Sequence, residues 1–486
     1  MLLGGSCSAR AQLPPEGQLI VTNNYNLDLY QGPVLSATRV IGLGGAFVAI
    51  ADGTEGQALN PAATAARVAY SFHHYDYDVG LGVTFPSAIG NSDFWNSGHR
   101  TELPKSQSTD FVFFNLALQL QLGRWGFGLS TDFQRYSLLR AVDPAANAQV
   151  DRLAARIAIG HLQVAHSFAD GQFLLGIGVR TTGLSVAKDN RTSIGGQNLF
   201  SSVGTGFESG FIWRPNGWQI RVGGAYRGGF DTRAAPKSTF IIYQDDDDNR
   251  LYLPNRVSLP WDLDVGFAAQ LGARPLNPRW IDPSIALEPM RRYLEWRAHE
   301  RDRRMRKAET TGGTLETARE RRHRLHKLRA ELRAEEDLDD HERSRVEKDL
   351  ERRLREHYHA QERFYVLVTT SLMVSGSVKN AVGIESMLDR TVQRSGEHLS
   401  VSPHVGAETE ILPNWLRIRG GSYLEPSRFE SNQKGARLHA TFGFDFNAFA
   451  WNVFGAWPPD AAWRISGSVD ASRSYLGWGV AIGNWH

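Results

Sequence analysis

The chain has a single cysteine, Cys7, in 486 residues, which excludes a framework of disulfides within the chain. It has no run of about 18 apolar residues, which excludes an ordinary helical membrane span. Its charges nearly cancel, with 54 Lys and Arg against 52 Asp and Glu, so no global field favours nucleic acid as a partner. Glycine (48 residues) and aromatic residues (10%) are instead abundant, as in membrane strands whose rings lie at the interfaces.

Strict alternation of apolar and polar residues, the pattern of a strand with one buried face, recurs along the chain. In Val257–Leu271 one face is almost wholly apolar, whereas the other includes Asp262 and Asp264. Trp125–Gln134 and the C-terminal Leu476–Gly483 repeat the pattern. In a soluble sandwich the apolar face would meet a second sheet, and in a membrane barrel it would meet lipid.

The links between the predicted strands differ in length. Short links are predicted at Gly123-Arg124, Ala169–Gln172, Arg214–Gly217 and Leu412–Asn414. Long links are predicted at Pro86–Ser108, Leu138–Arg152, Lys188–Asn198, Asp231–Asn255, Lys379–Leu399 and Glu425–Lys434. Short periplasmic turns and long external loops characterise bacterial outer-membrane barrels. We therefore expect an all-β transmembrane barrel of about 14 antiparallel strands.

A charged segment, 275–363, interrupts the strands and has helical spacing of its leucines, such as Leu325, Leu328 and Leu332. The acidic run Glu335–Asp340 is expected to begin or bend its last helix. The segment takes the place of a short link, so we expect it on the periplasmic side. It is either a solvated hairpin with charges paired at i,i+4, or a docking module for a periplasmic partner or the peptidoglycan layer.

The N-terminus has features of an exported protein. Ala9-Arg10-Ala11 resembles a small-x-small cleavage site, and Leu3–Cys7 faintly resembles a lipidation motif. The predicted domains are a signal remnant, a plug of the barrel lumen, two sets of barrel strands and the helical insertion between them, at 1–11, 12–66, 67–274, 364–486 and 275–363.

The plug prediction rests on Arg39–Ala63, a small, glycine-rich and apolar segment ahead of the first strands. Glycines let the backbone turn tightly in a narrow lumen. Asn60 precedes Pro61 and is therefore biased away from helix, which fits a bend where the plug meets the first strand. We expect the plug at the periplasmic end of the barrel.

These residues resemble the N-terminal plug of the FadL-like family of outer-membrane transporters for hydrophobic compounds. Leu259-Pro260-Trp261 and Leu416–Tyr423 resemble two strands of the same family. The matching plug residues are Arg39, Gly42, Gly44, Gly45, Ala46, Phe47, Ala49, Ala51, Asp52, Asn60, Pro61 and Ala62. The resemblance implies a plugged 14-stranded barrel that carries long-chain fatty acids or aromatic hydrocarbons and releases them through a gap in its wall. Related plugs also occur in PorV-like scaffolds of secretion systems.

The resemblance implies that the plug seals the barrel, alone or as a hatch that also gates it. The hatch residues are Arg39, Gly42, Gly44, Gly45, Asp52, Asn60, Pro61 and Ala62. Lumen arginines either bind a fatty-acid carboxylate or pair with Asp262, Asp264 and Asp470, because interior charges need partners. These arginines are Arg221, Arg227, Arg417 and Arg419, with Arg464 as a further member.

No motif indicates an enzyme, and no cofactor or metal is predicted. His74, Asp76 and Asp78 share one face of the first strand, where they form either a metal or acid-base site or part of the polar lumen surface that is expected in any case. Asp245–Asp248 lies in a predicted external loop, which is either solvated or bound to calcium or lipopolysaccharide-bridging cations. The expected location is the bacterial outer membrane. The expected partners are a hydrophobic small molecule, outer-membrane lipid and lipopolysaccharide, and a periplasmic protein that binds 275–363.

Two functions follow. The first is passive transport of hydrophobic small molecules through the barrel. The alternative is a structural scaffold whose periplasmic helical insertion docks a secretion, motility or envelope partner.

Overall fold

The computed structural model describes residues 13–67, 71, 73–86, 93–98, 106–140, 151–188, 198–236, 251–311, 317–432, 435–450 and 462–485. The predicted signal remnant and Asp245–Asp248 lie outside these residues. The described chain forms two units. One comprises the barrel and its plug, and the other comprises Pro278–Glu362 with Val68–Asp76.

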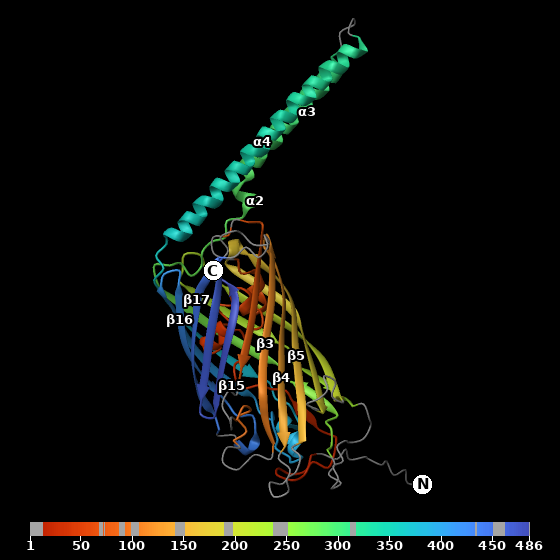
Figure 1. Ribbon diagram of the computed structural model, residues 1–486, viewed down its shortest axis with the longest axis vertical. Coiled ribbons are helices and arrows are strands. Elements are labelled where there is room, and N and C mark those ends of the chain that lie inside the picture. Colours follow the sequence, from red (N-terminus) through yellow and green to blue (C-terminus); the bar gives the residue numbers. More distant parts are fainter. Residues whose placement is uncertain are drawn as a thin grey trace, which may run out of the picture. The chain divides into compact units, whose positions relative to one another are not determined.

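Fourteen antiparallel strands close into a barrel within the described residues, because β7, near one end of the sheet, also pairs with β8 at the other end. Figure 1 shows these strands as a continuous wall. In order around the wall they are β7 (Asn198–Trp213), β6 (Phe173–Lys188), β5 (Asp151–Phe168), β4 (Trp125–Arg140), β3 (Ser106–Leu122), β2 (Tyr75–Phe85), β19 (Tyr475–Asn484), β18 (Ala462–Ser472), β17 (Arg437–Ala450), β16 (Leu416–Glu425), β15 (Ser400–Leu412), β13 (Tyr365–Ser375), β12 (Asp262–Gly272) and β8 (Ile220–Arg227). The predicted fold class and strand number are confirmed.

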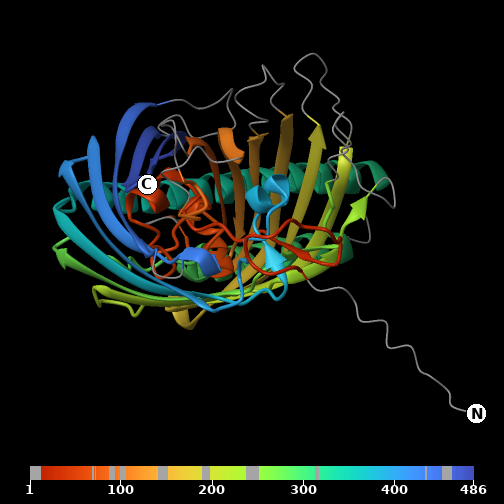
Figure 2. The same cartoon turned by 90° about the horizontal axis from the view of Figure 1, so that it is seen from below.

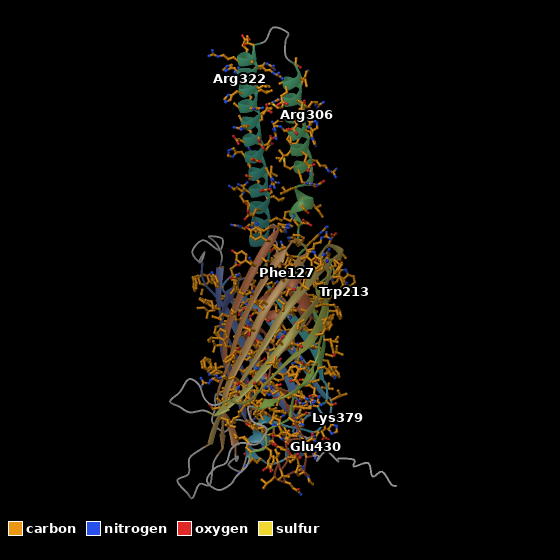
Figure 3. All side chains as sticks on the ribbon, turned by 90° about the vertical axis from the view of Figure 1, so that its right-hand side faces the viewer. Phe127, Trp213, Arg306, Arg322, Lys379 and Glu430 are labelled. Atoms are coloured by element: carbon orange, nitrogen blue, oxygen red, sulfur yellow. The ribbon has the colours of Figure 1, made fainter. Side chains whose placement is uncertain are left out.

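The wall has an apolar outside and a polar inside. On β4, Phe127 and Leu129 are 42% and 53% exposed, whereas the neighbouring Ser130 and Asp132 are buried in the lumen. Aromatic side chains such as Trp125, where β4 begins, are exposed at the end of the barrel that has the short links. Phe127 and Trp213 mark the outer surface in Figure 3. An apolar band bordered by aromatic rings is the surface that a bilayer requires.

The prediction of one strand over Val257–Leu271 was wrong in its first part. The chain forms two strands there, β11 (Arg256–Leu259) and β12, and only β12 belongs to the barrel. Pro260 lies at the break, where it cannot donate a ladder hydrogen bond. Val257 is fully buried in a separate hydrophobic core instead of facing outward.

That core belongs to a cap that the long links and the N-terminal segment build. Its sheet has the order β14-β1-β11-β9, with β1 parallel to both of its neighbours. The cap elements are β1 (Asn26–Asp28), β9 (Phe230–Arg233), β14 (Ala381–Val382), α5 (Ile384–Asp389) and η4 (Glu430–Asn432), while β10 (Ala235–Pro236) adds to β7. Leu27 and Met387 from the cap pack against lumen-facing residues such as Tyr136 and Phe200.

The chain then continues through the barrel as α1 (Thr38–Gly42), η1 (Thr54–Gly56) and η2 (Pro61–Ala65). Figure 2 shows this N-terminal segment, in red and orange, inside the ring of strands. Thr64 in η2 lies against Gly126, the second residue of β4, and so close to the short links. η3 (Ala169–Gly171) forms one of these links.

The second unit is a helical hairpin of α2 (Pro283–Ala286), α3 (Glu288–Thr310) and α4 (Ala318–Ala360), inserted between β12 and β13. α4 runs without interruption through Glu335–Asp340, so the prediction that this run begins or bends a helix was wrong. The acidic side chains form ion pairs between the two helices of the hairpin. Asp339 pairs with Arg301, and Glu335 lies 2.6 Å from Arg304 of α3. Among the described residues, no helix combines the length and apolar character needed to cross a bilayer.

Candidate functional site

The predicted hatch glycines lie where the plug turns back along the wall. Gly44 and Gly45 have φ values of 62° and 80°, in the left-handed region that favours glycine. Gly42 ends α1, and a Cβ on it would lie 2.8 Å from the Arg419 side chain. The sequence therefore uses glycine here for a tight turn and for close approach to the wall.

The barrel wall also has glycines where it contacts the plug, and the sequence analysis did not predict them. At each of these glycines an added Cβ would lie within 2.6 Å of a plug atom, so the plug packs directly on the strands. The wall glycines are Gly126, Gly176, Gly210, Gly223, Gly406 and Gly421. Glycines inside strand patterns signal close backbone approach, which is how this set could have been found.

Asn60 joins the end of the plug to the wall. Its side chain is fully buried and donates to the carbonyl of Val48 at 2.9 Å and to that of Phe211 in β7 at 3.1 Å. Its Oδ1 accepts from the Ala62 amide at 3.0 Å and so caps η2, with Pro61 as the first residue of that turn. The predicted bend at Asn60-Pro61 thus has three hydrogen bonds that fix it.

Arg39 ties α1 to the wall by a bidentate ion pair. Its Nε and Nη2 both donate to Glu408 of β15 at 2.8 Å. Burial alone favours a neutral guanidinium, but the Glu408 carboxylate outweighs that effect and holds the pKa of Arg39 well above its usual value. Glu408 also lies 3.1 Å from Arg419 of β16, so one carboxylate serves two cations.

The pairing continues around the wall and returns to the plug. Arg419 pairs with Asp445 of β17, and Asp445 lies 3.3 Å from Arg464 of β18. Arg464 then lies 2.7 Å from Glu55 in η1 of the plug. We call this alternating series the charge chain; its members are Arg39, Glu408, Arg419, Asp445, Arg464 and Glu55.

Two further contacts hold the plug at other strands. Asp52, a predicted hatch residue, lies 2.7 Å from Arg221 of β8. Thr54 bonds through its amide to Asp78 of β2 at 3.1 Å. Asp78, a member of the predicted polar face of the first strand, therefore contacts the plug.

The lumen arginines have protein partners, but mostly not those expected. Arg227 lies 3.8 Å from Asp262 and donates to the Leu59 carbonyl of the plug. Arg417 lies 3.3 Å from Glu410. Arg221, besides Asp52, donates to the Ile50 and Leu276 carbonyls and to Asn277 Oδ1. Asp470, an expected partner, accepts hydrogen bonds from Tyr423 and pairs with His439 instead.

A cavity of about 180 Å³ lies between the N-terminal segment and the wall. Its apolar lining includes Leu59, Ile157 and Ile159. Four buried polar atoms of its lining residues have no hydrogen-bond partner in the described part of the chain: Arg180 Nε, Thr182 Oγ1, Asp264 Oδ1 and His404 Nε2. Tyr30 also lines it, and burial raises the pKa of its hydroxyl. The cavity lining therefore combines apolar side chains with polar and charged ones.

No group of three histidine, cysteine, aspartate or glutamate residues in the described ranges is arranged to hold a metal ion. Asp76 accepts from Ser71 at 2.6 Å.

No protein-family model matches the sequence, and no curated protein matches it. Among solved structures, the chain is similar to a Pseudomonas aeruginosa FadL homologue, with 10% identity over 94% of this chain and 99% of that one and a TM-score of 0.46. It is similar to the Ralstonia pickettii toluene transporter TbuX, at 11% identity, 94% and 99% coverage and a TM-score of 0.43. A third is a deletion mutant of the monoaromatic hydrocarbon channel TodX, at 12% identity, 92% and 98% coverage and a TM-score of 0.48.

Proposed function

We propose that this protein carries hydrophobic small molecules passively across the bacterial outer membrane, with the plug as a hatch. The observation that carries the proposal is the cavity of about 180 Å³ between the N-terminal segment and the wall. An internal apolar cavity of about 150 Å³ is large enough to hold benzene. The apolar outer surface of the barrel supports a location in the membrane, and the plug supports gating rather than free diffusion.

The polar atoms in the cavity favour one kind of cargo. A buried polar group without a partner costs about 1–3 kcal/mol. Arg180 Nε, Thr182 Oγ1 and His404 Nε2 are such groups on residues that line the cavity. A cargo with an apolar body and one oxygen-bearing end, such as a fatty acid or a phenol, would satisfy them. A plain hydrocarbon such as toluene would leave them unpaired.

Filling the cavity tests the proposal. Ile159→Trp places a larger side chain in the cavity, whereas Ile177→Trp makes the same change at a position that is 53% exposed on the outer surface. Cells that carry Ile159→Trp should lose uptake of radiolabelled laurate, and those that carry Ile177→Trp should retain it. Equal uptake by both variants, at equal amounts of inserted barrel, would contradict transport through this cavity.

A scaffold remains the second candidate because the plug is held so firmly. The charge chain, Arg221 and Asp78 anchor it at separate strands, which favours a permanently closed barrel. Deleting 278–362 tests this function. The deletion begins after Leu276 and Asn277, so it keeps their hydrogen bonds with Arg221. If the protein is a scaffold with a closed barrel, the deletion should remove its cellular phenotype, and laurate uptake should not depend on the protein with or without 278–362. A transporter should keep its laurate uptake after the deletion and show no other defect.

A further inference from the structure

The helical hairpin contains a groove between its two long helices. Near the middle of the hairpin the helices are held together, where Asp339 of α4 pairs with Arg301 of α3. On the α2 side of this contact, a groove of about 1570 Å³ lies between α3 and α4. Its α4 wall runs from Glu336 to Glu351, which is about 22 Å of helix at 1.5 Å per residue.

The two walls of the groove differ in character, although the α3 wall also carries charges, at Glu288, Arg291, Arg292, Glu295 and Arg301. The α3 wall includes Leu287, Met290, Leu294 and Ala298, which recur at helical spacing and are partly or fully exposed. No residue of the α4 wall is apolar. The α4 residues are Glu336, Asp339, Asp340, Arg343, Ser344, Glu347, Lys348 and Glu351. The apolar stripe of α3 therefore faces charges across the groove, instead of the leucines that a packed hairpin would supply.

The α4 wall is also acidic. Its five carboxylates against Arg343 and Lys348 give a net charge of 2 − 5 = −3. Glu347 is matched by Arg343 at 3.0 Å, but Glu336 and Asp340 have no ion-pair partner in the part of the chain that the structure describes. An occupant must satisfy both walls, so it needs an apolar face and a basic face.

We propose that this groove is a docking site for a basic amphipathic helix of a partner protein. The apolar face of such a helix packs on the Leu287–Ala298 stripe, and its lysines or arginines face Glu336 and Asp340. Recognition of an amphipathic helix by a groove follows i, i+3, i+4 and i+7 anchors, which match the spacing of the stripe. This inference concerns a binding activity beyond the proposed transport and does not depend on it.

A designed peptide serves as the probe. It is a fluorescent helix of about 15 residues, matching the groove length, with leucine at i, i+3, i+4 and i+7 and lysine elsewhere. Binding to the full chain in zwitterionic nanodiscs is measured by anisotropy, with empty nanodiscs as the blank. Asp340→Lys should weaken binding at least about tenfold, because it sets like charges against each other. Glu342→Lys makes the same charge change on an exposed residue outside the groove, and should stay within about twofold of the native chain.

A second variant tests the other wall. Leu294→Asp should also weaken the peptide at least about tenfold, because it places a charge in the apolar stripe, and circular dichroism checks that the hairpin stays helical. A peptide of the same composition in scrambled order should bind the full chain in nanodiscs no better than it binds empty nanodiscs. The proposal is overturned if the native chain does not bind the probe, if a leucine-glutamate peptide binds equally well, or if Glu342→Lys weakens binding as much as Asp340→Lys.

Discussion

Replacing Asn60 with alanine tests how firmly the end of the plug is fastened to the barrel. The native side chain is fully buried and makes three hydrogen bonds, two to the Val48 and Phe211 carbonyls and one from the Ala62 amide. Alanine removes all three, and burial denies the two carbonyls and the amide a replacement from water. The bond to Phe211 is the one that joins the plug to β7, while the other two hold the shape of the bend.

The expected cost follows from these contacts. A typical hydrogen bond contributes about 0.5–1.5 kcal/mol net, and loss of a capping asparagine costs about 1 kcal/mol. Allowing for overlap between these terms, Asn60→Ala should destabilise the seated plug by about 2–4 kcal/mol. At about 1.4 kcal/mol per tenfold change, the population with this part of the plug released rises roughly 30- to 700-fold.

Hydrogen–deuterium exchange in nanodiscs measures that population. The Ala63 and Ala66 amides bond within the η2 turn, so their exchange reports its opening. Asn115→Ala is the matched control, because Asn115 is a buried asparagine that bonds Asp132 within the wall. Exchange at η2 should accelerate only in Asn60→Ala. An Asn60→Ala barrel that is folded and exchanges within about twofold of native would refute the reasoning, and the ion pairs alone would then seat the plug.

Two further predictions concern the charges. Arg39→Met and Glu55→Gln, which remove the two plug ends of the charge chain, should show a coupling of about 0.5–3 kcal/mol in a double-mutant cycle of thermal unfolding, because the wall charges link them. Arg39→Met with Glu430→Gln should be additive. The hydrogen bond with Glu397 raises the pKa of Glu430, so its stabilisation is present below the usual glutamate pKa and is lost as pH rises through the raised value. Exchange of the loop around Glu430 should therefore accelerate with pH beyond its intrinsic increase, and Glu430→Gln should abolish that excess.

The barrel was predictable because its information is local. Alternation along β4 or β12 fixes which side chains face outward, whatever the neighbouring strand is. The cap was not predictable, because its strands are only two to four residues long and come from four distant segments. Val257 illustrates the difference. Its alternation matched β12, yet it is buried by residues of the cap that local pattern cannot bring together.

The features of the hatch were likewise predictable only in part. The glycines at 42, 44 and 45 and the bend at Asn60 were predictable from backbone chemistry, because each acts through its own conformation. Whether these residues gate the barrel stays a prediction. The wall glycines that receive the plug were missed because a glycine in a strand does not say what approaches it.

The partners of the lumen arginines depend on strand register, which alternation leaves open. Alternation placed Arg417 and Arg419 on the lumen face, but it could not choose among the carboxylates on that face. The register sets Glu408 directly opposite Arg419, so these two charges must pair once β15 and β16 align. Arg39 of the plug, 369 residues before Glu408 in sequence, then pairs with the same carboxylate. Because the plug reuses a carboxylate that already balances a wall arginine, unseating Arg39 alone leaves Glu408 paired with Arg419.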